Sequence, residues 1–378
     1  MSPENDDEEQ SQWDDGRTGV QPEDVSGQII EPFDPARIRI GTGIFTVDLL
    51  LQRITDQVLD MSPGFQRKGS IWPVEAQSRL IESMLIRIPI PALYVDATDD
   101  EHWLIVDGLQ RLTVLHRFVT TQELRLRGME FLIGLNGKRF GELEARYQRR
   151  IKETQLILYK IEEGTPQNVK FNIFKRINTG GLSLSAQEIR HALNQGPVIS
   201  ILNELAESKA FLDATASGIS DKRMAAQECV LRFLAFSLAP YTEYKTGDLD
   251  GFLNEAMAYL NKLDDVRMHE LKARFLRAMH TARAIFGTDA FRKRYTPTAS
   301  RLPINKALFE AWSVNLGQLG PKQQEILAKR SDSLKARFID LMQNRDFDSA
   351  ISQGTGDVAK VTLRFERIHS LLQEELAG

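Results

Sequence analysis

Asp107, Gly108, Gln110 and Arg111 follow a short apolar run, and the side chains of Gln110 and Arg111 supply donors that could bind an anion. The run, residues 103–106, is typical of a buried strand, and Asp107-Gly108 is a turn dipeptide. Apolar residues at helical spacing come next, which predicts a helix that begins near Arg111. The first N–H groups of a helix lack partners within it, and the helix dipole favours negative charge there. The spacing therefore predicts an anion site; the alternative is a buried turn in which Asp107 caps the helix.

Two other stretches carry donors and glycines in predicted loops. Gln66, Arg67 and Lys68 are donors in a predicted loop between a Pro-Gly pair and Gly69. The second stretch, Asn178-Thr179-Gly180-Gly181, ends a predicted helix. A sequence of this kind can adopt positive φ and bring its backbone close to a ligand.

The composition is that of an ordinary globular protein, with 378 residues, 42% hydrophobic and 26% charged, long enough for two domains. The one cysteine, Cys229, excludes a disulfide framework and a Cys-rich zinc site. Its apolar neighbours favour a core helix. We find no apolar run long enough to cross a bilayer and no basic-then-apolar start, so we expect no membrane association and a cytoplasmic location.

The formal net charge of −4 conceals an asymmetry between the start of the chain and the rest. Residues 1–34 carry 11 acidic residues against Arg17 alone. This start lacks hydrophobic periodicity, so we expect a disordered acidic tail. It could screen a basic groove in the same chain, or it could simply be solvated.

The remaining pattern predicts an α+β protein: a domain with a small mixed sheet, followed by an all-helical domain. Apolar or alternating runs predict strands, and 3.6-residue periodicity predicts helices. The expected strands are residues 38–44, 92–95, 103–106, 130–133 and 155–161, and the expected helices of this half are residues 48–58, 78–86 and 141–152, with two more beginning at 166 and 185. Glu82 is expected to be solvated or paired with Arg79, and Ser185 with Glu188 has the capping-box spacing.

After residue 197 the strand pattern disappears. The expected helices there are residues 199–208, 225–238, 249–263, 266–286, 305–317 and 323–344. Residues 291–294 and Arg301 form basic points in loops between these helices. They could face nucleic acid, although such clusters are more often solvated surface.

Five motifs occur in one order that resembles a known family. They are Phe65-Gln66-Arg67 with Trp72, Ser78-Arg79-Leu80-Ile81-Glu82-Ser83, Ile88-Pro89-Ile90-Pro91, Asp107-Gly108-Leu109-Gln110-Arg111-Leu112 and Arg176-Ile177-Asn178-Thr179-Gly180-Gly181. The order resembles the GmrSD-type restriction endonuclease N-terminal family, whose core is a ParB/sulfiredoxin-like fold. Family members usually read Asp-Gly-Gln-Gln-Arg, the DGQQR motif, where this chain has Leu109. The expected organisation is an acidic tail (1–34), a ParB-like nucleotide-binding domain (35–196) and a helical domain (197–378).

The resemblance implies nucleotide chemistry in prokaryotic defence against phage or modified DNA. ParB-like domains bind or hydrolyse nucleoside triphosphates, and some members cut DNA. Many relatives carry an HNH nuclease, but the six histidines of this chain are scattered and form no His-Asn-His cluster. The expected function is therefore an NTP-binding and hydrolysing switch, or sensor, that works with DNA and a separate nuclease or defence subunit. The alternatives are a ParB-like DNA nuclease and a non-enzymatic reader of modified DNA.

A triphosphate requires several donors that converge on its oxygens, and arginine offers a planar fork that matches phosphate. Asp107 is the expected carboxylate for Mg²⁺ or for orienting water, and Asp107 and Arg111 are the expected catalytic pair. No residue identifies the base. The residues expected to bind the nucleotide are Gln66, Arg67, Gly108, Gln110, Arg111, Asn178, Gly180 and Gly181.

Overall fold

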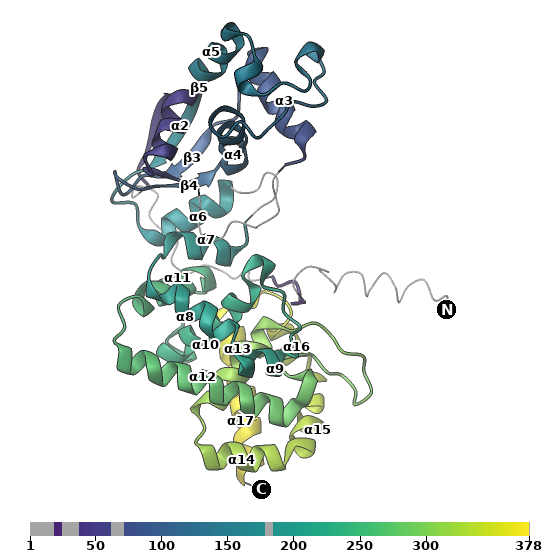
Figure 1. Ribbon diagram of the computed structural model, residues 1–378. Helices are drawn as coiled ribbons and strands as arrows, with labels where there is room; N and C mark the ends of the chain where they lie inside the picture. Colours follow the sequence, from purple (N-terminus) through teal and green to yellow (C-terminus); the bar gives the residue numbers. More distant parts are fainter. Residues whose placement is uncertain (1–18, 25–37, 62–71, 178–183, 378) are drawn as a thin grey trace. The chain divides into compact units, whose positions relative to one another are not determined.

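The computed structural model describes residues 19–24, 38–61, 72–177 and 184–377. Its contacts divide the chain into two units. The sheet unit comprises residues 33–184, and the helical unit comprises residues 185–378 together with residues 1–32. In Figure 1 the sheet unit runs from purple to teal, and most of the helical unit from teal to yellow. The α+β class, with a small mixed sheet before a helical region, is as the sequence predicts.

The sheet has five strands in the order β1-β5-β3-β4-β2. Two pairs are antiparallel, β1 with β5 and β3 with β4, and two are parallel, β3 with β5 and β2 with β4. The predicted strands at 38–44, 92–95, 103–106 and 155–161 are confirmed. The strands are β1 (Ile40–Thr46), β2 (Leu59–Asp60), β3 (Leu93–Asp96), β4 (Trp103–Asp107) and β5 (Gln155–Ile161).

Helices α2 to α5 pack on one another beside the sheet and share its hydrophobic core. Alternate residues of β5, Leu156 and Leu158, are buried in this core, whereas Ile157 between them is exposed. Helix α6 contacts β4, and Lys170 of α6 forms a 3.1 Å ion pair with Asp96 at the end of β3. The helices are α2 (Val47–Thr55), α3 (Val74–Leu85), α4 (Leu109–Leu115), α5 (Ala145–Glu153) and α6 (Gln167–Ile177).

The predicted strand at 130–133 is wrong. The backbone N–H groups of Glu130, Phe131 and Leu132 donate to the carboxylate of Glu82, at 3.0, 2.8 and 2.8 Å, instead of to a neighbouring strand. The segment is therefore a turn followed by a short 3-10 helix. The Glu82 carboxylate, from a helix distant in the sequence, accepts the backbone hydrogen bonds that a neighbouring strand would accept in a sheet.

The helical unit is built around one continuous core that includes Cys229, Phe233, Phe275 and Trp312. The burial predicted for Cys229 is confirmed, and it raises the pKa of the thiol to about 12. The predicted helix at 323–344 is two helices that meet at Arg330, and three further helices were not predicted: α9, α16 and α17. The helices are α7 (Ala186–Leu193), α8 (Pro197–Ala206), α9 (Lys209–Thr215), α10 (Ala225–Leu238), α11 (Leu249–Leu260), α12 (Asp265–Phe286), α13 (Lys306–Gln318), α14 (Pro321–Lys329), α15 (Ser331–Met342), α16 (Arg345–Ala350) and α17 (Val358–Ala377).

The boundary between the two units lies between residues 184 and 185, whereas the sequence pattern predicted it between 196 and 197. Helix α7 lies between these two positions and packs against α10 and α11. Its capping box, predicted from Ser185 and Glu188, is present. Burial of α7 against later helices, which no local pattern encodes, accounts for the difference.

Part of the acidic start is ordered against the helical unit. Val20 pairs with Ile304 in a parallel bridge, and Gln21 N donates to the carbonyl of Ile304 at 2.8 Å. The carboxylate of Glu23 is buried and binds Arg232. For residues 19–24 the expectation of a disordered tail is therefore wrong; the rest of residues 1–34 lies outside the described residues.

Two of the three basic residues in 291–294, Arg292 and Lys293, turn inward. Arg292 is buried and donates to the carbonyls of Leu302 and Thr215, at 2.5 and 3.2 Å. Lys293 is buried as well and donates to the hydroxyl of Ser352. The expectation that this run could face nucleic acid is wrong for these two residues, because backbone carbonyls and a hydroxyl of the same unit take up their donors.

Candidate functional site

The turn between β4 and α4 requires a glycine at residue 108. Gly108 has φ +98°, a left-handed conformation that side chains disfavour. A Cβ at this position would lie 2.0 Å from Cδ2 of Leu93, so the neighbouring strand leaves no room for one. The helix begins at Leu109, two residues before the predicted start, and Leu109 packs against the sheet-unit core. This packing explains how an apolar residue is accommodated in the middle of the motif.

Arg111 is held from two sides. Its Nη2 donates to Oδ2 of Asp107 at 2.6 Å, and its Nη1 donates to the carbonyls of Pro91 and Ala92, at 2.6 and 3.2 Å. The Arg111 side chain is 11% exposed and that of Asp107 is 31% exposed. Arg111 therefore braces the turn against the segment that precedes β3. Asp107 does not cap the helix as the alternative interpretation had it: the N-cap is Gly108, which has no side chain to offer.

The carboxylate of Asp107 keeps an acceptor available. In the described part of the chain its Oδ2 receives the Arg111 bond, and Oδ1 has no hydrogen-bond partner. A β-bulge lies beside it, since Asp107 opposes Tyr94 and Ile105 opposes Val95, which leaves Val106 as an extra residue. Bulges bend a strand and re-aim its side chains, and they are common beside active sites. Asp107 is thus oriented by Arg111 and still open to a further ligand.

Gln110 connects the turn to Trp72. Its Oε1 accepts a hydrogen bond from the backbone N–H of Trp72 at 3.3 Å. Trp72 is the first described residue after the loop that carries Gln66 and Arg67, and those two residues lie outside the described residues. Asn178, Gly180 and Gly181 also lie outside them. The structure therefore brings together Asp107, Gly108, Gln110 and Arg111 and links Trp72 to the same turn.

Glu82, which the sequence placed in solvent or beside Arg79, is a buried anchor. Burial raises the pKa of its carboxyl, but the three backbone N–H bonds described above lower it further, so the pKa lies below its usual value. Ser78, one turn earlier on α3, accepts a bond from the N–H of Arg127 at 2.9 Å. Arg79 instead pairs with Glu130 at 3.6 Å. The i, i+4 spacing of Ser78 and Glu82 on a helix with apolar neighbours was the available signal for one shared inward face.

Two further observations concern metals and membranes. Within the described ranges there is no group of three or more His, Cys, Asp or Glu side chains that could hold a metal ion together. The same ranges contain no helix with the length and apolar character that a bilayer crossing demands.

Comparison with known families assigns the segment that contains this turn. Residues 47–194 match the family model described as GmrSD restriction endonuclease, N-terminal domain. No curated protein matches the chain. The matched segment runs from the start of α2 to the end of α7 and contains the five ordered motifs quoted above; residues 231–235 and 305–309, which also resembled the family, lie outside it. Residues 47–194 are therefore similar to the N-terminal domain of the GmrSD restriction endonucleases.

Proposed function

We propose that this chain is a nucleoside-triphosphate-binding and hydrolysing switch in a prokaryotic restriction or phage-defence system. The matched domain family points to such a system. In this proposal nucleotide binding at the β4–α4 turn controls an encounter with DNA. A separate nuclease or defence subunit carries out the response.

The observation that supports nucleotide binding is that hydrogen bonds hold the Arg111 guanidinium in place while the described residues leave some of its N–H donors unused. A guanidinium has five N–H donors, and three of them are used by Asp107, Pro91 and Ala92. Nε and the second Nη2 hydrogen have no partner among the described residues. A planar cation that is held rigidly and keeps two donors can bind phosphate at a low entropic cost. Arg111 thus orients Asp107 and offers its remaining donors to a phosphate oxygen.

Asp107 fits the role of a single protein ligand for Mg²⁺. Magnesium prefers oxygen ligands and is commonly held by one or two carboxylates together with the phosphates of the substrate. Bound Mg²⁺ would neutralise phosphate charge and lower the pKa of a bound water. The contribution of the chain is to hold Oδ2 of Asp107 against Arg111, which leaves Oδ1 for the ion. Because Arg111 compensates the carboxylate, an anionic nucleotide meets less repulsion at the turn.

The test is to measure nucleotide affinity and stability on the same variants. Calorimetric titration of the full chain with each of the four nucleoside triphosphates and Mg²⁺ should show binding of at least one. Arg111→Ala should weaken that binding roughly ten- to a hundredfold, because a charge-assisted contact contributes about 1.5–3 kcal/mol. Arg111→Lys should restore only part of the affinity, since lysine keeps the charge but not the fork. Unchanged affinity in Arg111→Ala, with a clear loss of thermal stability, would leave Arg111 a purely structural brace.

Lys170→Met is the matched control in the same unit. Lys170 and Asp96 form an ion pair whose side chains are 9% and 10% exposed, comparable to the 11% of Arg111. Breaking this pair should lower the melting temperature and leave nucleotide affinity unchanged. The nuclease and DNA-reader alternatives are separated by incubating the same preparation with DNA and Mg²⁺. DNA cleavage that is lost in Asp107→Asn would favour the nuclease, and DNA binding that ignores nucleotides would favour the reader.

A further inference from the structure

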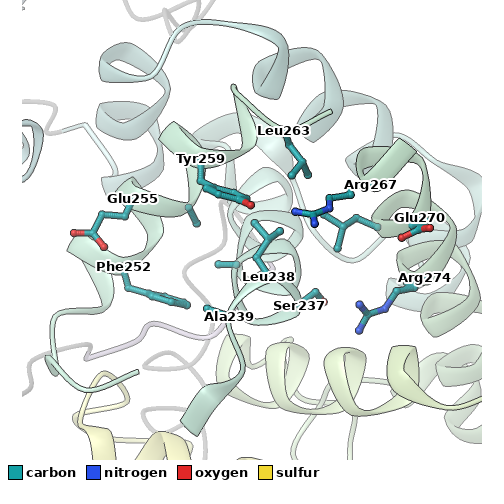
Figure 2. Close-up of a pocket in the computed structure, with 13 residues that line it drawn as sticks. Ser237, Leu238, Ala239, Phe252, Glu255, Tyr259, Leu263, Arg267, Glu270 and Arg274 are labelled. Atoms are coloured by element: carbon teal, nitrogen blue, oxygen red, sulfur yellow. The ribbon is translucent and has the colours of Figure 1, made fainter. Parts of the chain in front are cut away.

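A pocket of about 580 Å³ opens in the helical unit, away from the motifs of the matched domain. It lies between the C-terminal end of α10 and helices α11 and α12 (Figure 2). Its apolar lining includes Leu238, Phe252 and Leu263. Pockets that hold small organic molecules have about 300–1,000 Å³ and pair an apolar lining with a few polar groups. This one has the size and lining for such a molecule.

Arg274, on α12, lines the pocket together with Glu270, one turn earlier on the same helix. No hydrogen bond or ion pair joins its guanidinium to any other described residue. The side chain is partly buried, and its pKa is lowered because burial disfavours the cation and Arg277 repels it, while Glu270 offsets only part of this effect. A partly desolvated cation of this kind gains free energy when an anion binds beside it.

Ser237, near the end of α10, supplies a second unsatisfied group. Its Oγ is buried and has no hydrogen-bond partner among the described residues. Figure 2 shows the guanidinium of Arg274 reaching toward Ser237, and that of Arg267 reaching toward Leu238. Glu255 lies at the opposite end, beside Phe252. The end of the pocket at Arg274 and Ser237 also carries Arg267 and the carboxylate of Glu270, and an apolar lining leads away from it.

We propose that this pocket binds an organic acid with an apolar body, whose acidic group contacts Arg274 and Ser237. The body lies on Leu238 and Leu263 and extends toward Phe252. The oxygens of the acid accept bonds from the guanidinium and from the Ser237 hydroxyl, which satisfies both groups. This inference does not depend on nucleotide binding at the β4–α4 turn, because every residue that carries it belongs to the helical unit.

Two fluorescent probes that differ only in the acid test the proposal. Anilinonaphthalene sulfonate has a fused aromatic body and a sulfonate; phenylnaphthylamine has the same rings and no acid. We expect saturable binding of the sulfonate at one site per chain, and at least about tenfold weaker binding of the neutral probe. Melting curves recorded on each preparation ensure that only folded protein is titrated.

Three substitutions locate the site. Arg274→Gln should weaken sulfonate binding by about tenfold or more and leave the neutral probe unaffected. Ser237→Ala should weaken it by about two- to fivefold without loss of stability, because it removes a buried hydroxyl that has no partner. Arg283→Gln, at an exposed position on the same helix, is the control and should change neither. The proposal would be overturned by equal affinity for both probes or by absence of saturable binding. It would also be overturned if Arg274→Gln and Ser237→Ala left the affinity for the sulfonate unchanged.

Discussion

Two arginine–carboxylate arrangements, one in each unit, show different ways of holding a charge. In the sheet unit Arg111 binds Asp107 and two carbonyls, and donors and an acceptor remain. In the helical unit Arg232 is 1% exposed and contacts Glu23, Glu228 and Glu310. Arg364 also binds Glu310, and Lys306 binds Glu228 at 2.8 Å. Three cations thus meet three carboxylates in what we call the buried cluster.

In the buried cluster the cations and the carboxylates compensate each other's charge. Burial alone would raise the pKa of Glu23, but Arg232 and Lys306 more than offset this, and the pKa lies below its usual value. The same causes lower the pKa of Glu228, and the three carboxylates raise that of Arg232. With its charges matched, the cluster has no reason to attract a ligand. Asp107 and Arg111, in contrast, keep unused bonding capacity at a partly exposed turn, which is what a binding site requires.

The largest effect is expected when the buried cluster loses its central cation. Arg232→Met leaves Glu23 without its arginine and removes one partner from two other buried carboxylates. Breaking a buried pair in this way costs about 3–5 kcal/mol, because the remaining charges are uncompensated. Urea unfolding of the full chain measures this loss. Lys209→Met, which breaks an exposed pair on α9, should leave the unfolding curve unchanged. Equal unfolding midpoints for the two variants would show that the charge pairing of the buried cluster does not stabilise the fold.

Glu23→Gln should have a smaller, pH-dependent effect. Because the folded-state pKa of Glu23 is lowered from 4.5, its contribution to stability is present above that pH and is lost as the pH falls through the folded value. At neutral pH the substitution should cost about 1.5–3 kcal/mol, since it removes a charged hydrogen-bond partner. The difference from the parent chain should shrink below pH 4.5 in a series of unfolding curves. A difference that is constant with pH would mean that Glu23 contributes through its shape rather than its charge.

The smallest stability change is expected for a substitution of Asp107 in the Asp107–Arg111 pair, together with a large change in activity. Asp107→Asn keeps the size of the side chain and one acceptor for Arg111, so it should cost only about 1 kcal/mol at this partly exposed position. If Asp107 holds Mg²⁺, nucleotide hydrolysis should fall at least about tenfold, as measured by phosphate release. A stability loss as large as that of Arg232→Met, with hydrolysis intact, would mean that Asp107, like the buried cluster, only stabilises the fold.

Local sequence determined the elements around the candidate site. The apolar run, the Asp-Gly dipeptide and the helical spacing that follows were enough to place β4, the turn and α4, because each depends on neighbours within a few residues. The same holds for α10 and β5, whose predicted bounds of 225–238 and 155–161 match the structure. The family motifs added the expectation of nucleotide chemistry, but not the bonding of any one side chain.

Tertiary structure alone decided which charged residues are buried and what they bind. Glu23 and Arg232 are 209 residues apart in the sequence, and Glu82 is 48 residues from Glu130. No periodicity relates such positions, so an acidic tail residue, a helix glutamate and the basic residues Arg292 and Lys293 all seemed to belong to the surface. Each is buried because its partners come from distant segments, and a buried charge is stable only where such partners converge.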